Sequence, residues 1–130
     1  MKAEPKFVLD ASALLAYLQH EPGFEKVQKA LAGGAVMSTV NVAEVYAKVV
    51  ARGLPVREIA ANLAALGLGM VSFTESDAQG SAALHPRTRQ LRLSLGDRAC
   101  IAVGIQLGLP VLSADRAWKG IPGVKVEMLR

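Results

Sequence analysis

The sequence predicts an α/β protein, a three-layer α/β/α sandwich around a central parallel sheet of four to five strands. Short aliphatic runs alternate along the chain with longer stretches of helical periodicity, which is the order of elements in such a sandwich. The runs are continuously apolar, as expected for parallel strands that helices cover on both faces. A length of 130 residues suits one domain, so we expect residues 1–130 to form a single domain.

Five aliphatic runs are the predicted strands. They comprise residues 6–10, 35–38, 70–73, 110–113 and 124–128. Each run is short and rich in Val, Leu or Met, which favours a buried strand. Met37, Met70 and Met128 fall within these runs, so we expect all three methionine side chains to lie in the core.

Six segments between and beside the strands carry the periodicity of helices. They comprise residues 11–20, 24–31, 42–52, 56–66, 75–84 and 95–107. Leu14, Leu15 and Leu18 recur at helical spacing in the first segment, and residues 21–23 (Glu-Pro-Gly) end it. The last segment is apolar on nearly every side, which is typical of a buried helix. Residues 85–86 (His-Pro) are expected in a loop.

Composition excludes several classes of protein. The apolar fraction of 52% and the positive mean hydropathy exclude an intrinsically disordered chain. With a single cysteine, Cys100, neither an intrachain disulfide nor a Cys/His zinc site can form, which suits a reducing compartment. The longest apolar stretch, residues 99–112, is too short to span a membrane, and the N-terminus does not resemble a secretory signal. We therefore expect a cytoplasmic protein outside the membrane.

Four acidic residues occupy related places at the ends of the predicted strands. Asp10 ends the first strand, and Asp115 follows the fourth. Glu44 is expected in the first turn of the helix after the second strand, and Asp97 opens the buried helix. Parallel strands place their carboxyl ends at one edge of the sheet, so these carboxylates should meet there. A hard cation, Mg²⁺ or Mn²⁺, would offset their repulsion, polarise a phosphoryl oxygen and lower the pKa of water.

A second interpretation treats these acids as helix caps alone. Residues 94–97 (Ser-Leu-Gly-Asp) and 41–44 (Asn-Val-Ala-Glu) both have the form of a capping box. Each acid would then stabilise a helix end by only ~0.3–1 kcal/mol. Asp10 has no evident capping role except through Ser12. Under this interpretation the protein is a non-catalytic α/β module that binds RNA or another protein.

Four segments resemble the acidic motifs of PIN-domain nucleases. They are residues 7–14 (Phe-Val-Leu-Asp-Ala-Ser-Ala-Leu), 41–45 (Asn-Val-Ala-Glu-Val), 95–102 (Leu-Gly-Asp-Arg-Ala-Cys-Ile-Ala) and 111–118 (Val-Leu-Ser-Ala-Asp-Arg-Ala-Trp). In length and motif order the whole chain resembles a VapC-type toxin of a type II toxin–antitoxin pair. This resemblance implies a PIN-like fold and a Mg²⁺-dependent endoribonuclease that hydrolyses RNA phosphodiester bonds, with Mn²⁺ as a substitute for Mg²⁺.

The resemblance also implies roles for individual residues and partners. All four acids would form the catalytic pocket, with Asp10 and Asp97 as the main metal ligands. Ser12 and Ser113 match small polar positions beside the acids. A homodimer and a cognate antitoxin protein are the implied partners. Surplus apolar positions in the predicted helices over residues 24–31, 42–52 and 56–66 are consistent with burial against another chain.

The basic residues suggest where RNA would bind. With the four candidate acids set aside, seven acidic residues remain against 15 basic ones. Arg87, Arg89 and Arg92 lie in an acid-free segment that leads into the third acidic motif, so we expect them to bind RNA phosphates. Arg98 would either pair with a site carboxylate or contact RNA. Trp118 is the one aromatic residue near these bases, which argues against base stacking as the main source of affinity.

One further enzyme class remains open from the residues alone. A phosphoaspartyl phosphatase would use Asp10 as its nucleophile. Enzymes of that kind place a second aspartate two residues later as the general acid, and here that position holds Ser12. The sequence therefore favours the nuclease over the phosphatase.

Overall fold

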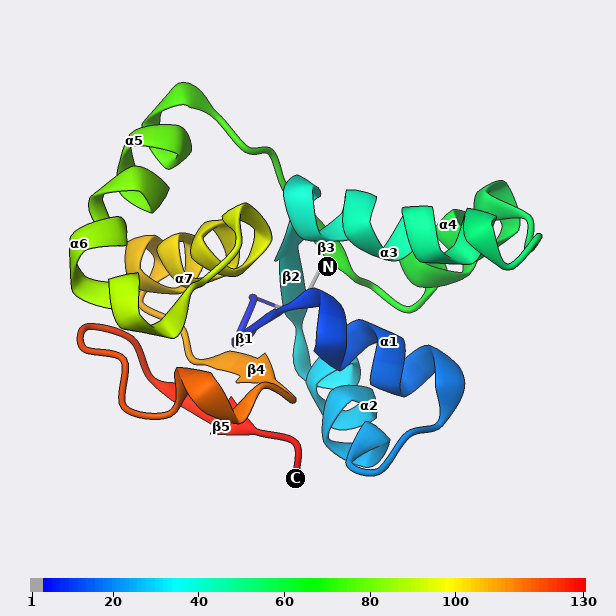
Figure 1. Cartoon of the computed structure of the whole chain (residues 1–130). Helices are drawn as coiled ribbons and strands as arrows, with labels where there is room; N and C mark the ends of the chain where they lie inside the picture. Colours follow the sequence, from blue (N-terminus) through cyan, green and yellow to red (C-terminus); the bar gives the residue numbers. More distant parts are fainter. Residues whose placement is uncertain (1–3) are drawn as a thin grey trace.

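Five parallel strands form the central sheet of the protein, in the order β3-β2-β1-β4-β5 (Figure 1). The computed structural model describes residues 4–130. The strands are β1 (Phe7–Leu9), β2 (Ala35–Ser38), β3 (Gly69–Val71), β4 (Val111–Ser113) and β5 (Val126–Met128). Because β1 is the central strand, its carboxyl end lies in the middle of one edge of the sheet. The predicted parallel sheet is confirmed.

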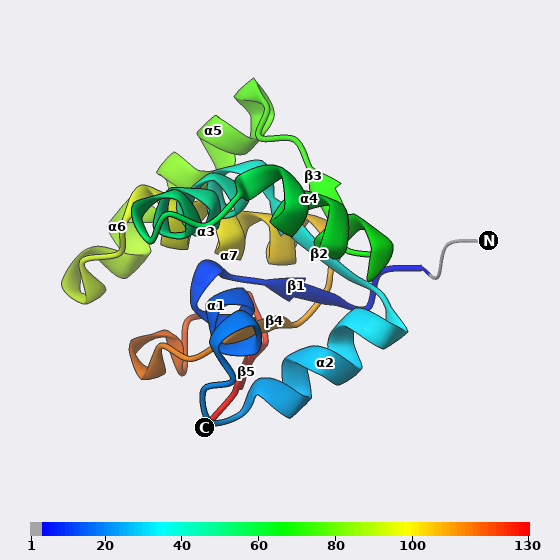
Figure 2. The ribbon, with the colours of Figure 1, turned by 90° about the vertical axis from the view of Figure 1, so that its right-hand side faces the viewer.

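Helices cover both faces of this sheet, which confirms the predicted three-layer sandwich. They are α1 (Ala11–Gln19), α2 (Phe24–Gly33), α3 (Thr39–Ala51), α4 (Val56–Ala65), α5 (Glu75–Ala83), α6 (His85–Thr88) and α7 (Leu95–Leu107), with 3₁₀ turns η1 (Arg89–Leu91) and η2 (Arg116–Trp118). Figure 1 shows α1 to α4 on one side of the sheet and α5 to α7 on the other, and Figure 2 views the protein from the α1 to α4 side. Within residues 4–130, no helix has the length and apolar character to cross a membrane.

The alternation of side chains along the strands divides the core into two clusters. Leu9 of β1 pairs with Leu112 of β4, and both pack with α1, α2 and α3. Val8 pairs with Val111, and both pack with α7 on the opposite face. Trp118 of η2 is fully buried in the second cluster. A parallel sheet covered on both faces explains why the strand sequences show no polar alternation.

The helix predicted over residues 42–52 begins three residues earlier than expected. Ser38 caps α3, because its Oγ accepts a hydrogen bond from the backbone N–H of Val40 (3.2 Å), so the helix starts at Thr39. The capping residue is itself the last residue of β2, which leaves no loop between strand and helix. The other predicted elements are present with ends shifted by at most two residues.

One of the three methionines predicted in the core is on the surface. Met37 of β2 is fully buried, as expected, and Met128 of β5 is partly buried. Met70 of β3 is 44% exposed, so its prediction as a core residue is wrong. The reason is that β3 is an edge strand that pairs only with β2, and its central side chain faces away from both core clusters.

A short helical segment occupies the region predicted as a loop around His85. Pro86 lies in the first turn of α6. A backbone N–H in this turn has no partner within the helix, so proline, which lacks this N–H, removes no hydrogen bond there. The hydroxyl of Thr88 donates a hydrogen bond to the carbonyl of Leu84 (2.7 Å), and both residues are buried. Neither α6 nor η1 is long enough to show helical periodicity, which is why the sequence pattern did not predict them.

The packing of α7 on β4 leaves no room for a side chain at Gly104. A Cβ there would lie 2.5 Å from Cγ2 of Val111 and 3.2 Å from Cγ2 of Val124. We expect Gly104→Ala to lower the free energy of unfolding by about 1–3 kcal/mol in urea denaturation, because the helix would have to move off the sheet. Gly33→Ala is the matched control, since the space beside Gly33 is open. Equal unfolding free energies for the two variants would contradict this packing.

Candidate active site

Asp10 is a buried carboxylate at the carboxyl end of the central strand. Its side chain is 5% exposed and accepts hydrogen bonds from three directions. The backbone N–H of Ala13 donates to Oδ1 (2.7 Å), the hydroxyl of Ser113 donates to Oδ2 (2.7 Å), and the hydroxyl of Ser12 donates at 2.7 Å from Oδ1. Asp10 therefore caps α1 through Ala13, so the expectation that it caps only through Ser12 is wrong.

Ser12 and Ser113 join the ends of β1 and β4 around this carboxylate. The Ser12 hydroxyl accepts a hydrogen bond from the N–H of Ala114 (3.0 Å), and the Ser113 hydroxyl accepts one from the N–H of Asp115 (2.9 Å). Because each hydroxyl oxygen already accepts from the backbone, its own hydrogen is left to point at Asp10. The two serines predicted to support the acids thus lie in contact with one of them.

Burial is the main influence on the protonation of Asp10. Loss of water raises the pKa of its carboxyl from the ordinary value of 3.8 to about 6. The hydrogen bonds from Ser113, Ser12 and Ala13 act in the opposite direction, and the negative charge of Asp97 adds to the increase. The carboxylate is therefore strongly hydrogen-bonded yet lacks an opposite charge beside it.

Glu44 lies on α3, beyond its first turn. The sequence placed it in the first turn within a capping box, and this is wrong because α3 begins at Thr39. Instead, the side-chain amide of Asn41 donates to Oε1 of Glu44 (3.0 Å) and to the carbonyl of Gly96 at the start of α7 (2.9 Å). Asn41 is 1% exposed, so this link between the two helices is shielded from water.

Gly96 allows the Glu44 carboxylate to lie directly against the first turn of α7. A Cβ at Gly96 would overlap both carboxylate oxygens of Glu44, so any larger residue would displace them. The contact places Glu44 next to the residue that precedes Asp97. Sequence analysis missed both Asn41 as a link and Gly96 as a requirement. The only available signal was a glycine in the first turn of a helix, where it is not needed for the backbone.

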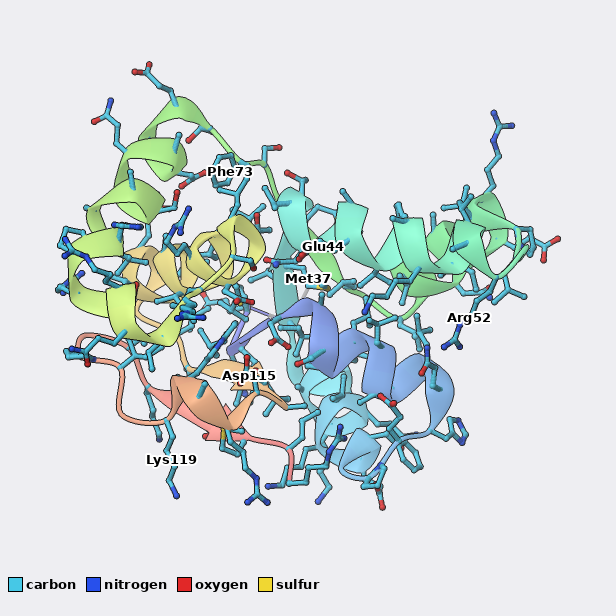
Figure 3. The ribbon with its side chains drawn as sticks, viewed as in Figure 1. Met37, Glu44, Arg52, Phe73, Asp115 and Lys119 are labelled. Atoms are coloured by element: carbon cyan, nitrogen blue, oxygen red, sulfur yellow. The ribbon has the colours of Figure 1, made fainter. Side chains whose placement is uncertain are left out.

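Asp97 and Asp115 each cap a helical segment, as the second interpretation expected. Asp97 and Ser94 form a complete capping box at the start of α7, with hydrogen bonds of 3.0 and 3.1 Å. Asp115 accepts a hydrogen bond from the N–H of Ala117 (2.9 Å) and caps η2. Figure 3 shows Asp115 and Glu44 on either side of the point where β1 meets α1. Glu44 caps no helix, so capping does not account for its position.

Three of the four predicted acids raise the pKa of the same buried thiol, that of Cys100. The thiol of Cys100, on α7, has a pKa well above its ordinary value because it is fully buried and because Asp10, Asp97 and Glu44 all repel its ionised form. These carboxylates come from β1, α7 and α3, so the fold brings together residues that are far apart in the sequence. Asp115 lies at the periphery and connects to Asp10 through Ser113.

Among residues 4–130, no basic side chain forms a salt bridge with these acids. Within residues 4–130, the one salt bridge joins Lys125 to Glu127, far along the chain from the acidic positions. Arg98 does not pair with a site carboxylate, contrary to one of the two expectations. Its guanidinium donates instead to the carbonyl of Leu93 (3.0 Å). The uncompensated charge is the electrostatic condition under which a bound cation is most favourable.

The acids do not form a complete metal cage as they stand. In the part of the chain that the structure describes, no three His, Cys, Asp or Glu side chains are close enough to hold an ion together. The four acids and the two serines nevertheless offer only oxygen atoms, a set that suits a hard divalent cation.

The three arginines predicted to bind RNA lie on the surface of the α6–η1 segment. Arg87 is on α6, Arg89 begins η1, and Arg92 follows η1 in a left-handed backbone conformation (φ 52°). All three side chains are exposed. The one nearby aromatic residue, Trp118, is fully buried and unable to stack on a base.

Comparison with known proteins identifies the family of this chain. The family model of the PIN domain matches residues 7–124, nearly the whole sequence. The chain belongs to the PIN domain family. The resemblance inferred from the four acidic motifs is therefore confirmed. No curated protein has a sequence that matches this PIN domain significantly.

Solved structures of similar fold include several toxin–antitoxin complexes. A toxin–antitoxin complex from Klebsiella pneumoniae superimposes with a TM-score of 0.75 and 17% sequence identity, covering 96% of this chain and 98% of the other. DNA-bound VapBC from Salmonella typhimurium superimposes with a TM-score of 0.76 and 15% sequence identity, and the match covers 98% of this chain and 100% of the other. VapBC-5 from Mycobacterium tuberculosis superimposes with a TM-score of 0.60 and 23% sequence identity, and the match covers 98% of this chain and 99% of the other. At these identities the comparison establishes the shared fold.

The raised pKa of Asp10 predicts how stability depends on pH in EDTA. Between pH 3.8 and about 6 the folded protein binds more protons at this carboxyl than the unfolded chain does. Its contribution to the free energy of unfolding therefore falls as the pH rises through this range, by on the order of 3 kcal/mol, and does not return above it. We expect urea denaturation at pH 4.5 and 7.0 to show this decrease in the wild type.

Two variants isolate the contribution of Asp10. Asp10→Asn should have a flatter dependence of stability on pH over the same range, because the titrating group is gone. Asp115→Asn is the control, since Asp115 is exposed and its removal should leave the decrease in place. The same pH dependence in Asp10→Asn and the wild type would show that this carboxyl titrates at its ordinary value.

Proposed function

We propose that this PIN domain is a divalent-metal-dependent endoribonuclease and the toxin of a type II toxin–antitoxin pair. PIN domains are typically nucleases. The observation that carries the proposal is the buried carboxylate of Asp10 at the carboxyl end of the central strand, together with Glu44, which lies against the residue that precedes Asp97. Burial of a carboxylate away from water costs stability, so the buried Asp10 is the strongest candidate for a functional group.

Asp10 and Asp97 would be the main metal ligands, with Glu44 and Asp115 completing the acidic pocket. All four supply only oxygen, so Mg²⁺ or Mn²⁺ is the expected cation. When bound, such an ion would polarise a phosphoryl oxygen and lower the pKa of a nearby water. The hydrogen bonds from Ser12 and Ser113 would hold the Asp10 carboxylate in one orientation at this edge of the sheet.

Glu44 would orient the attacking water, and the arginines would bind the RNA strand. Oε1 of Glu44 accepts a hydrogen bond from Asn41, which leaves Oε2 to orient a water for attack on phosphorus. Arg87, Arg89 and Arg92 would bind the phosphates of the strand and bring one of them to the acids. Hydrolysis in this arrangement would leave a 5′-phosphate and a 3′-hydroxyl.

The proposed toxin would be held by an antitoxin protein and would form a homodimer. Support comes from the similar folds, which were solved as toxin–antitoxin complexes. It also comes from a groove of about 370 Å³ between α1, α3 and α4, lined mainly by apolar side chains such as Leu15, Leu18 and Ile59. Arg52, labelled in Figure 3, lies at this groove, and exposed Val50 and nearby apolar residues extend the surface. Partner proteins would cover this apolar area.

Asp10→Asn is the decisive test of the nuclease. With Mg²⁺ and a single-stranded RNA, we expect the wild type to cleave and Asp10→Asn to lose at least about 100-fold in rate, because oriented charge at the reacting group contributes that much. Asp77→Asn is the matched control. Like Asp10, Asp77 is a buried acid that caps a helix, but its capping box lies at the start of α5. Circular dichroism would establish that both variants fold.

The outcomes separate the competing functions. If Asp10→Asn and the wild type behave alike toward RNA, the acids are only helix caps and the non-catalytic interpretation holds. A phosphate trapped on Asp10 would identify a phosphoaspartyl phosphatase. Cleavage of single-stranded DNA in preference to RNA would overturn the substrate assignment. Mg²⁺ or Mn²⁺ should also raise the melting temperature of the wild type and not that of Asp10→Asn.

Gly96→Ala tests whether the contact between α3 and α7 matters for activity. The new methyl group would displace the Glu44 carboxylate, so we expect cleavage to fall by at least about tenfold while the fold is kept. Gly80→Ala, on the neighbouring α5, is the control because its Cβ would make only an ordinary contact with Ala102 at 4.0 Å. Full activity in Gly96→Ala would exclude Glu44 from the reaction.

A further inference from the structure

A cavity of about 570 Å³ lies between the α6–η1 segment and the loop that joins η2 to β5. In Figure 1 these two segments face each other at the edge of the protein, far along the chain from one another. The lining residues on the first wall are Pro86, Arg87, Arg89, Gln90 and Leu91, and those on the second are Lys119, Gly120, Ile121 and Pro122. Its volume is that of a site for a small molecule rather than for a single ion.

Both walls of the cavity are anchored in the core. On one wall, Thr88 is hydrogen-bonded to Leu84, and the side chain of Leu84 is 1% exposed. On the other wall, Trp118 and Ile121 are buried in the same hydrophobic cluster as Leu84. The cavity therefore has a fixed shape, which lowers the cost of ordering a ligand within it.

The cavity carries positive charge and has no acidic lining residue. Arg87 reaches across from α6, since its Nη1 would lie 3.8 Å from a Cβ built on Gly123 of the opposite loop. Arg89 lines the same wall. Lys119 is a further basic lining residue, and Figure 3 shows its side chain extending away from the body of the protein. Two arginines at one cavity supply the positive charge and the N–H donors that a phosphate group binds.

Part of the remaining lining is apolar. Pro86, Leu91 and Pro122 are exposed and offer aliphatic surface, Ile121 is buried, and Gln90 adds a polar side chain. A phosphate alone would not use this surface, whereas the sugar and base of a nucleotide would cover it. The combination of paired arginines and aliphatic surface thus fits a nucleotide better than a free anion.

We propose that this cavity is a subsite for one nucleotide of the RNA strand, with the phosphate between Arg87 and Arg89 and the sugar and base against the aliphatic lining. The proposal rests on the nuclease function proposed above and specifies where the strand lies. Arg92 does not line the cavity, so its contribution to RNA binding is smaller than those of the other two arginines.

Both walls lead directly to the acidic positions. The second wall begins where η2 ends, and Asp115 caps the start of this single turn, about 6 Å away. The first wall continues through Leu93, whose carbonyl is bonded to Arg98 beside Asp97. Each wall of the cavity is therefore next along the chain to a segment that carries one of the acids, Asp115 for the second wall and Asp97 for the first.

The test uses binding of RNA by the Asp10→Asn protein in EDTA, so that no cleavage occurs. A fluorescent single-stranded RNA of mixed sequence is titrated at several salt concentrations. We expect Arg87→Gln and Arg89→Gln each to weaken binding by about tenfold and to reduce the slope of log K against log salt by about 0.7, the value for one lost phosphate contact on a single strand. Leu91→Ser should weaken binding without changing this slope, because it removes an apolar contact.

One control variant and one control ligand complete the design. Arg57→Gln, on exposed α4, should change affinity and slope less than the two cavity variants. Adenosine monophosphate is tested as a competitor, and tight binding of this free nucleotide would overturn the assignment to an RNA strand. Unchanged affinity and slope in Arg87→Gln and Arg89→Gln would overturn the subsite, while cleavage by the wild type would show independently that the nuclease stands.

Discussion

The buried carboxylate of Asp10 is the interaction on which the arrangement of the site depends. It lies where β1 ends and α1 begins, and it receives hydrogen bonds from α1 and from the end of β4. These bonds stabilise the ionised form, while burial and the charge of Asp97 destabilise it. The balance holds an acid in the centre of the sheet edge without a cation beside it. Cys100 beneath it stays neutral, because ionisation there would add a further buried charge.

Helix capping and a role in the candidate site are not alternatives in this fold. Asp97 and Asp115 both cap helical segments, and a helix N-terminus is favourable for a negative charge. Capping therefore fixes the carboxylates at the sheet edge and offsets part of their repulsion. Glu44 is different, since it caps no helix and is held by Asn41 and by the space that Gly96 leaves. A residue kept in place by such specific contacts, without a role in helix stability, is the strongest indication that the cluster has a chemical purpose.

The charges of the protein are separated in a way that suits a polyanionic strand. Acids gather at the carboxyl ends of β1 and β4, whereas the acid-free α6–η1 segment carries arginines along the edge of the molecule. A phosphodiester chain would be attracted by the second region and repelled by the first until a cation is present. This contrast explains how one small domain could bind a strand broadly and still react at one phosphate.

Local sequence was sufficient for the strands and most of the helices. Apolar runs, helical periodicity and caps depend on neighbouring residues, so they can be recognised without knowing the fold. Tertiary structure decided what depends on distant segments: the contact of Glu44 with Gly96, the exposure of Met70 at a sheet edge, and the cavity between α6 and the loop after η2. Sequence spacing carries no information about these contacts, because packing between layers, rather than local propensity, sets which side chains meet.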